Sequence, residues 1–247
     1  MTVAPTSVRP RREPHRPHGA LIAVVLLAFL LGGLAVALLY HFEVLGGSSS
    51  SASGAEGSGV SATQTRAVSA FHSVELAGGN NVVIHVGEKR SVVVRADDNL
   101  LGRVTTKVAS GKLVIGNTPG SLTTKSPMSV VVNVPTLSAV TLAGGGNIVV
   151  AGSNSERLTV TLSGGGNVTG RGSARRLDVT LSGSGNVWFT QLPAHSVHAV
   201  LRGSGTIYVT ATRSLEAAVP GSGTIIYSGN PRNVTKSVTG SGTIAGS

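Results

Sequence analysis

Basic side chains recur at a regular spacing in the second half of this chain. They lie seven or eight residues before successive glycine-rich motifs, and they are Arg157, Arg175, Arg176, His195, Arg213 and Arg232. Guanidinium groups bind phosphates and carboxylates through charge and paired N–H donors. We therefore interpret these residues as a basic stripe and hypothesise that its arginines bind anionic envelope polymer or lipid head groups. The alternative is a solvated edge that discourages aggregation between sheets.

Other residues that could bind a metal or take part in catalysis form weaker patterns. His195 and His198 have a metal-like spacing, but we expect them in a loop between repeats with no carboxylate nearby, so no metal site is predicted. Asp97 and Asp98 are adjacent, and we expect a solvated turn before Asn99. The chain has no cysteine, which excludes disulfides, thiolate zinc sites and cysteine nucleophiles. We find no G-x-S-x-G, Walker A or H-E-x-x-H motif, and we predict neither an enzyme nor a cofactor.

Two further readings of these residues remain as alternatives. Polysaccharide-active enzymes combine clustered acids with aromatic platforms, for which Trp188, Tyr208 and Tyr227 are the candidates, but the acidic residues here are scattered. The glycine-rich motifs could be phosphate cradles, but a nucleotide site needs one such loop opening a helix. Six copies with no helix behind them indicate structural turns. We expect no nucleic-acid partner.

The glycine motif itself sets the architecture. The sequence Gly-Gly/Ser-Gly-Asn/Thr-Ile/Val occurs six times, with spacings of 20, 19, 20, 18 and 19 residues. The copies begin at the structural turn glycines Gly144, Gly164, Gly183, Gly203, Gly221 and Gly240. A degenerate copy begins at Gly78 and has Asn80 in place of the third glycine. Asn is the residue other than Gly that best tolerates positive φ, so this substitution suggests a left-handed backbone at that position.

The residues around each motif alternate in the manner of strands. Positions two, four and six residues before the first glycine are apolar in most copies, as in Leu158, Val160 and Leu162, and the residues between are mostly polar. A period near 19 with two short strands per copy predicts one coil of a β-solenoid, stacked in parallel on the next about 4.8 Å away. Leucine-rich repeats are rejected because their asparagine follows the last leucine by three residues. Here Asn167 follows Leu162 by five.

Before the repeats, the sequence predicts further strands. The β-branched runs are 82–86, 91–96, 104–108 and 112–115. Ser110-Gly111 predicts a hairpin turn between the last two runs. The continuous apolar run 129–134 is typical of a strand buried on both faces.

These residues carry a family resemblance. The Gly-Ser-Gly-Asn/Thr-Ile repeats, the lead-in 71–76, the strand in 129–137 and the hairpin 110–113 resemble the putative auto-transporter adhesin, head GIN domain family of bacterial envelope proteins. The resemblance covers roughly residues 66–247. It implies a right-handed parallel β-helix and a bacterial source, and it brings no catalytic residues with it.

The N-terminal part predicts a membrane anchor. Residues 19–40 carry no charge and are long enough to cross a bilayer as one helix, with a cleaved signal peptide as the alternative. Residues 1–18 form a basic head that we expect in the cytoplasm, which places the C-terminal domain outside the cell membrane. Residues 41–65 are a Gly/Ser-rich tether that we expect to be unable to order itself. From residue 66 onward the chain has 16 Lys/Arg and 7 Asp/Glu, a net charge of +9.

Together these observations predict one N-terminal transmembrane helix followed by an all-β domain. Residues 66–136 form an N-terminal strand region and residues 137–247 the repeat solenoid of about 19-residue coils. The predicted function is a non-enzymatic surface binding or adhesion module, with a structural or sensory envelope protein as the alternative and a polysaccharide-active enzyme less favoured. Because the sequence stops in mid-coil at 240–247, we also expect self-association through the C-terminal coil.

Overall fold

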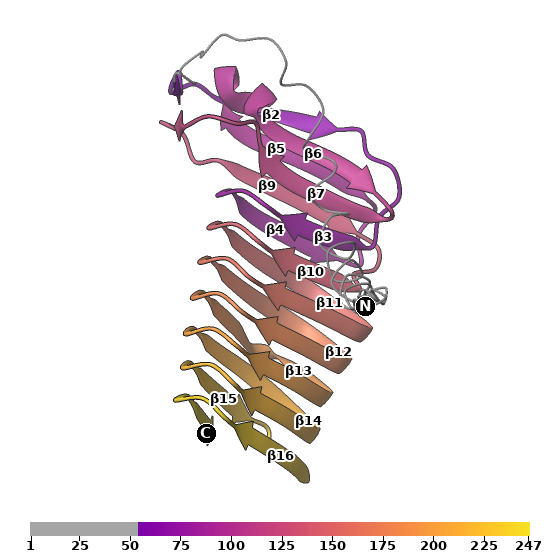
Figure 1. Ribbon diagram of the computed structural model, residues 1–247. Coiled ribbons are helices and arrows are strands. Elements are labelled where there is room, and N and C mark those ends of the chain that lie inside the picture. Colours follow the sequence, from indigo (N-terminus) through magenta and orange to yellow (C-terminus); the bar gives the residue numbers. More distant parts are fainter. Residues whose placement is uncertain (1–53) are drawn as a thin grey trace, which may run out of the picture. The chain divides into compact units, whose positions relative to one another are not determined.

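The computed structural model describes residues 54–247, which belong to one compact unit, Ala52–Ser247 (Figure 1). This unit is a mostly β-stranded solenoid of about five turns, which confirms the all-β solenoid of the predicted fold class. The predictions of a basic head, a transmembrane helix and a tether as far as residue 53 concern residues outside the described part of the chain. Within residues 54–247, no helix has the length and apolar character needed to cross a bilayer.

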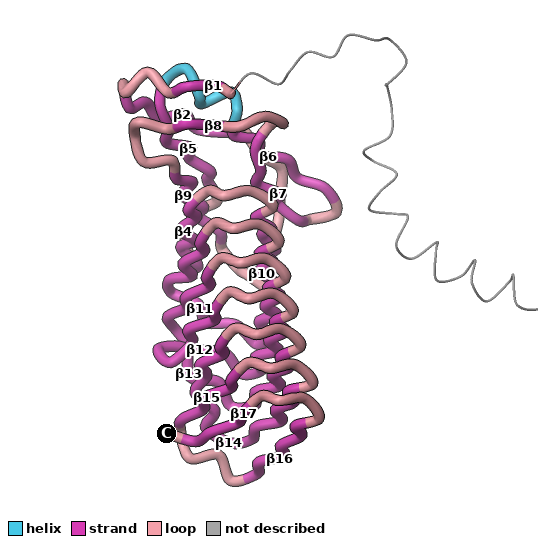
Figure 2. Tube along the Cα trace, turned by 60° about the vertical axis from the view of Figure 1, so that its left-hand side comes forward, coloured by secondary structure: helices cyan, strands magenta, loops and turns pink. Residues whose placement is uncertain are grey.

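The repeats form parallel coils in the predicted register. Asn147 lies opposite Asn167, and Leu142 lies opposite Leu162, which lies opposite Leu181. The strands are β10 (Ala139–Leu142), β11 (Asn147–Leu162), β12 (Asn167–Leu181), β13 (Asn186–Leu201), β14 (Thr206–Val219), β15 (Thr224–Ser228), β16 (Asn233–Val238) and β17 (Thr243–Gly246). The glycine turns connect these strands and stack along one edge, as the pink loops of Figure 2 show.

One detail of the predicted coil is wrong. Instead of two short strands separated by loops, β11 to β14 each continue for 14–16 residues around the edge opposite the glycine turns. Each long strand follows one glycine turn and precedes the next. We call the segments that precede the turns the first layer and those that follow them the second layer. Their apolar side chains meet between the layers and form a continuous buried core.

The solenoid begins earlier than predicted. The degenerate copy at Gly78 joins β3 (Ser73–Leu76) to β4 (Asn81–Val86), and these strands pair in parallel with β10 and β11. Leu76 lies opposite Leu142 in this register. The predicted boundary at 136/137 therefore separates strands that belong to one stack.

Residues 87–138 form a cap inserted between the first and second coils. The cap contains β5 (Ser91–Asp97), the 3₁₀ helix η1 (Asp98–Arg103), β6 (Val104–Ala109), β7 (Lys112–Asn117), β8 (Leu122–Thr123) and β9 (Ser129–Val134). Strand β7 pairs in parallel with β3, and strand β9 pairs in parallel with β4. Strand β6 then pairs antiparallel with β7 in the first layer, and β5 pairs antiparallel with β9 in the second layer. Ser110 and Gly111 have positive φ, which confirms the predicted hairpin. The 129–134 strand buries one face completely and the other only in part.

The end of the predicted tether is ordered, so the tether prediction is wrong for residues 55–65. Strand β1 (Ala55–Glu56) pairs with β8, and β2 (Ser61–Arg66) pairs antiparallel with β5. Most side chains of β2 are exposed. Composition misled here because backbone pairing with an existing sheet, and not apolar burial, orders this segment.

The repeated glycines are required by close packing between coils. A side chain on Gly164 or Gly166 would overlap the carbonyl oxygen of Gly144 or Gly146 in the preceding turn. A Cβ on the middle residue, Gly165, would have only Ser184 Oγ nearby, at 3.9 Å, which explains why serine takes this position in later copies. Neither the turn glycines nor Asn80 have positive φ, so the left-handed backbone inferred from Asn80 is wrong. Asn80 fits because no glycine turn precedes it, and its Nδ2 donates to Asn117 Oδ1 at 2.9 Å.

The asparagine of the motif forms a ladder along the turns. Asn147 Nδ2 donates to Asn81 Oδ1 at 2.9 Å, Asn167 to Asn147 at 3.0 Å, and Asn186 to Asn167 at 3.2 Å. Asn186 Oδ1 then accepts from the backbone N–H of Thr206 at 3.2 Å, where the motif changes to threonine. Each such hydrogen bond contributes about 1 kcal/mol to stability. The ladder thus ties neighbouring coils together at their turns.

Candidate binding surfaces

The predicted basic stripe forms two adjacent columns at the edge where β11 to β14 bend. Arg157 lies opposite Arg176, and this column continues through Ser196, Ser214 and Asn233. The second column consists of the residues that immediately precede those of the first column in the sequence. They are Glu156, Arg175, His195, Arg213 and Arg232. The arginines are all exposed, but only the second column stays basic over most of its length.

Carboxylates hold three of the five arginines. Asp178 Oδ2 accepts from Arg157 Nε at 2.7 Å, and its Oδ1 accepts from Arg176 Nε at 3.1 Å. Asp178 is only 14% exposed, so it holds both guanidinium groups against the first layer. Arg175 lies 3.7 Å from Glu156 in the second column. Among the described residues, Arg213 and Arg232 make no ion pair, so the uncompensated positive charge gathers toward β14 and β16.

The two histidines do not lie in a loop. His195 and His198 both belong to β13, and His198 lies in register between Asp178 and Glu216. The expectation that no carboxylate is near is therefore wrong for His198, whose Nε2 is 4.0 Å from Glu216 Oε1. Within residues 54–247, no three His, Cys, Asp or Glu side chains gather as metal ligands.

Asp97 and Asp98 have different environments. Asp98 begins η1 and is exposed, as expected of a solvated turn, but Asp97 is completely buried at the end of β5. Its carboxylate accepts from the backbone N–H groups of Gly59 at 2.9 Å, Lys125 at 3.0 Å and Ser126 at 3.3 Å. Burial opposes the charge, but these hydrogen bonds outweigh it and lower the pKa of Asp97. Asp97 therefore joins the segment before β2 to the loop before β9, which corrects the prediction that it is solvated.

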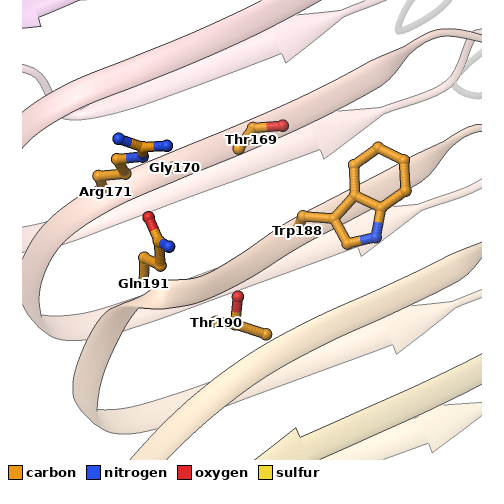
Figure 3. A pocket seen from close by; sticks show the side chains of 6 residues that line it. All are labelled: Thr169, Gly170, Arg171, Trp188, Thr190 and Gln191. Atoms are coloured by element: carbon orange, nitrogen blue, oxygen red, sulfur yellow. The ribbon is translucent and has the colours of Figure 1, made fainter.

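A hollow that the sequence analysis did not predict opens on the second layer (Figure 3). It measures about 250 Å³ and is lined by Thr169, Gly170, Arg171, Trp188, Thr190 and Gln191. The indole of Trp188 is 38% exposed and is drawn nearly face-on in Figure 3, with Arg171 and Gln191 to one side. The ring of Tyr208 on the next coil is tilted by only 23° from the indole, with centroids 6.4 Å apart.

The family follows from a comparison with family models. A model described as putative auto-transporter adhesin, head GIN domain, matches residues 70–231, which is well over half of the chain. The chain belongs to the head GIN domain family. This confirms the resemblance read from the glycine repeats. A search of the curated proteins finds no match to this chain.

Solved structures share the head GIN domain fold. A putative adhesin from Bacteroides fragilis is 23% identical, with a TM-score of 0.67, and the match covers 78% of this chain and all of the other. A putative adhesin from Parabacteroides distasonis is 19% identical, with a TM-score of 0.50, over 78% of this chain and 100% of the other. A putative lipid binding protein from the same species is 20% identical, with a TM-score of 0.52, over 78% and 99%. None of the three is described as an enzyme.

The spacing of the head GIN domain repeats contains only a partial signal for the missed hollow. The coil that starts at Gly183 is 20 residues long, whereas the preceding coil has 19 and the following coil 18. In the structure, two residues separate Trp188 from Gln191, but only one separates Thr169 from Arg171. The extra residue makes the corner of β13 irregular beside the exposed indole. The coil that starts at Gly144 is also 20 residues long, so this departure from the period was visible in the sequence but does not by itself mark the site.

Proposed function

We propose that this head GIN domain protein is a non-enzymatic binding module at the bacterial cell surface, held near the membrane by residues 19–40. The family description and the adhesins among the solved structures support a role in surface adhesion. The architecture is consistent with this role, because a solenoid offers long outer faces that repeat every coil.

The observation that carries this proposal is the second column of the basic stripe. Arg213 and Arg232 extend from successive coils with no carboxylate paired to either in the described part of the chain. Adjacent cations about 5 Å apart suit a ligand whose negative charges also repeat, such as a phosphate-bearing polymer or a bilayer of anionic lipids. The ligand of this surface is therefore an array of phosphate groups, from either envelope polymer or lipid head groups.

The test separates these two sources of phosphate. The triple variant Arg175→Glu, Arg213→Glu and Arg232→Glu is compared with the wild type for binding to an anionic cell-wall fraction and to phosphatidylglycerol vesicles, in low and high salt. We expect wild-type binding that weakens with salt and is abolished in the variant. Binding to only one of the two preparations identifies the source.

A matched control carries the same change in charge at other exposed positions. The control variant combines Lys89→Glu, Lys107→Glu and Arg202→Glu. The three native side chains make no ion pair in residues 54–247 and lie outside the stripe. This control should lose far less binding than the stripe variant. Equal losses in both variants, or unchanged binding of the stripe variant, would contradict the proposal.

The C-terminal coil supports a second binding role, the self-association expected from the sequence. Val234 and Val238 occupy apolar rows of the core, but they are 40% and 46% exposed because no further coil covers them in residues 54–247. Lys236 stands between them, where the preceding coil has Ala217, and its Nζ lies 4.7 Å from the ring centroid of Tyr227. The exposed valines favour pairing with a second copy, and the charge of Lys236 limits it.

A further inference from the structure

The hollow beside Trp188 has the chemistry of a sugar site and is separate from the basic stripe. Its walls come from the second-layer parts of β12 and β13, and no stripe arginine lines it. The outward column through this site reads Val149, Thr169, Trp188, Tyr208 and Ile226 on successive coils. The short side chain of Thr169 precedes the large indole in this column, so one end of the aromatic pair is left open.

The core explains why the hollow is there. Phe189, the largest fully buried side chain, points inward from β13 beneath Gly170. A Cβ atom on Gly170 would lie 2.6 Å from Phe189 Cε1, so this position has to lack a side chain. The additional residue between Trp188 and Gln191 moves the corner of β13 out of step with β12. The hollow is thus fixed by the buried packing beneath it.

The polar groups around the hollow are available to a ligand. Within residues 54–247, the side chains of Thr169, Arg171, Thr190 and Gln191 make no hydrogen bond or ion pair with another protein group. The guanidinium groups of Arg157 and Arg176, in contrast, both donate hydrogen bonds to Asp178. Arg171 therefore offers an uncommitted cation with paired N–H donors in a hollow whose other side carries the exposed indole (Figure 3).

We propose that this hollow binds one pyranose ring of an acidic polysaccharide, a sugar that carries a carboxylate. The C–H-bearing face of the ring packs on the exposed indole of Trp188, because these hydrogens are weakly positive and the face of an aromatic ring is negative. Arg171 pairs with the carboxylate, and Gln191 and Thr190 hydrogen-bond to hydroxyl groups. Tyr208 extends the aromatic surface to the next sugar of the chain.

The dimensions favour binding of one unit of a surface polymer. At about 250 Å³, the hollow is smaller than the roughly 300–1,000 Å³ pockets that enclose whole small molecules. None of the residues that line it is Asp, Glu or His, the usual groups for acid–base cleavage of a glycosidic bond. The site is therefore suited to hold a sugar chain in place. This inference does not depend on the basic stripe and extends the proposed binding role to a second surface.

The experiment uses Trp188 as its own reporter, because it is the only tryptophan of the chain. The fluorescence of the purified full-length protein is followed while uronic acid tetramers are added, from polygalacturonate, from alginate and from a glucuronate polymer, each beside its neutral methyl ester. We expect saturable quenching or a spectral shift with at least one tetramer. Arg171→Gln should weaken binding of that tetramer by about tenfold and leave the neutral ester unaffected, as expected for one charge-assisted contact.

Calorimetry extends the test to variants without a tryptophan. Trp188→Ala should lose most of the binding, and Trp188→Phe should recover part of it because a smaller aromatic face remains. Arg202→Gln, the same substitution at an exposed position outside both the hollow and the basic stripe, should leave the titration unchanged. Fluorescence unchanged by all three acidic tetramers would overturn the inference, as would tetramer binding that Arg171→Gln and Trp188→Ala both leave intact.

Discussion

Glycine is required for different reasons in the coils and in the cap. In the coils, the first and third glycines of each turn have no positive φ, but a side chain on either would meet the carbonyl of the preceding turn. In the cap, Gly87 and Gly120 have positive φ and open space around them. A glycine that repeats with the coil thus indicates backbones in close contact, whereas an isolated one indicates a tight turn.

The strongest test of this comparison is a side chain at a stacked turn. In Gly166→Ala, the new methyl group would overlap the carbonyl oxygen of Gly146, and its three nearest neighbours are all backbone atoms of Gly145 and Gly146, so no flexible side chain can move aside. We expect a loss of about 3 kcal/mol or more in the free energy of unfolding, at the upper end of overpacking costs. Urea unfolding followed by circular dichroism measures this change.

Gly165→Ala is the matched control in the same turn. The nearest atom to its Cβ would be Ser184 Oγ at 3.9 Å, and its φ is not positive. We expect a change within about 0.5 kcal/mol, or a small gain from reduced freedom of the unfolded chain. If both alanine variants lost equal stability, close stacking would not be the reason for the glycines.

In the cap, the largest effect is expected at Asp97. Asp97→Asn keeps the shape but replaces one carboxylate oxygen with an NH2 group, so the side chain can no longer accept both from Gly59 and from Lys125 and Ser126. Hydrogen exchange should then speed up around residues 57–59 and 125–126, with the coils beyond β11 still protected. Uniform loss of protection along the whole solenoid would show that the cap and coils unfold as one unit.

The lowered pKa of Asp97 gives the same segment a pH dependence. Its stabilising contribution is complete above the unfolded-state pKa, near 3.8, and is lost as the pH falls through the lower folded-state pKa. Acid should therefore loosen the 57–59 segment in the wild type. In Asp97→Asn, this segment should already be loose at neutral pH and change little on acidification, as amide exchange measured between pH 2 and 6 would reveal after correction for intrinsic rates.

A smaller effect is expected at the hairpin turn of the cap. Gly111 has a φ of 72°, and a Cβ there would also lie 2.8 Å from His72 Nε2. Gly111→Ala should cost about 1–2 kcal/mol, the price of a left-handed residue with a side chain. Thermal unfolding provides the measurement. A cost as large as that of Gly166→Ala would remove the distinction between the two uses of glycine.

The smallest effect on folding is expected at the open coil. Lys236→Val restores the apolar row between Val234 and Val238, so the stability of the monomer should change little. Sedimentation velocity should show greater self-association than in the wild type, because an inward charge no longer opposes pairing of the exposed edge. Lys236→Arg, which keeps the charge, is the control. Identical sedimentation of all three proteins would argue against association through this coil.

Most of the solenoid could be predicted because its signal repeats. Alternating apolar residues such as Leu158, Val160 and Leu162 identify one buried face, and evenly spaced glycines fix where the chain turns. The role of the glycines was misread from Asn80, because one sequence shows which residue occupies a position but not which neighbouring backbone approaches it. Stacking distance becomes visible only when the coils are placed on one another.

The cap and the candidate sites depend on contacts that no local pattern reveals. The buried carboxylate of Asp97 accepts hydrogen bonds from backbone N–H groups 38 and 28 residues away in the sequence. Contacts at such separations produce no periodic pattern in the sequence. Arg157 and Arg176 belonged to the predicted stripe, but Asp178, two residues from Arg176, holds both. The hollow at Trp188 could not be predicted because it depends on the packing of the buried Phe189 beneath Gly170 on the neighbouring coil, a contact that the spacing of the repeats does not reveal.

Deletion of one complete coil tests the stacked architecture most directly. Removing residues 164–182 joins Ser163 to Gly183 and brings two equivalent turns together, so we expect a folded, cooperatively unfolding protein that is one coil shorter. Removing residues 164–173 deletes about half a coil and places core positions out of register, so this variant should not fold. Circular dichroism and urea unfolding of both deletions give the result. A half-coil deletion as stable as the complete one, or collapse of both, would contradict an account built on interchangeable coils.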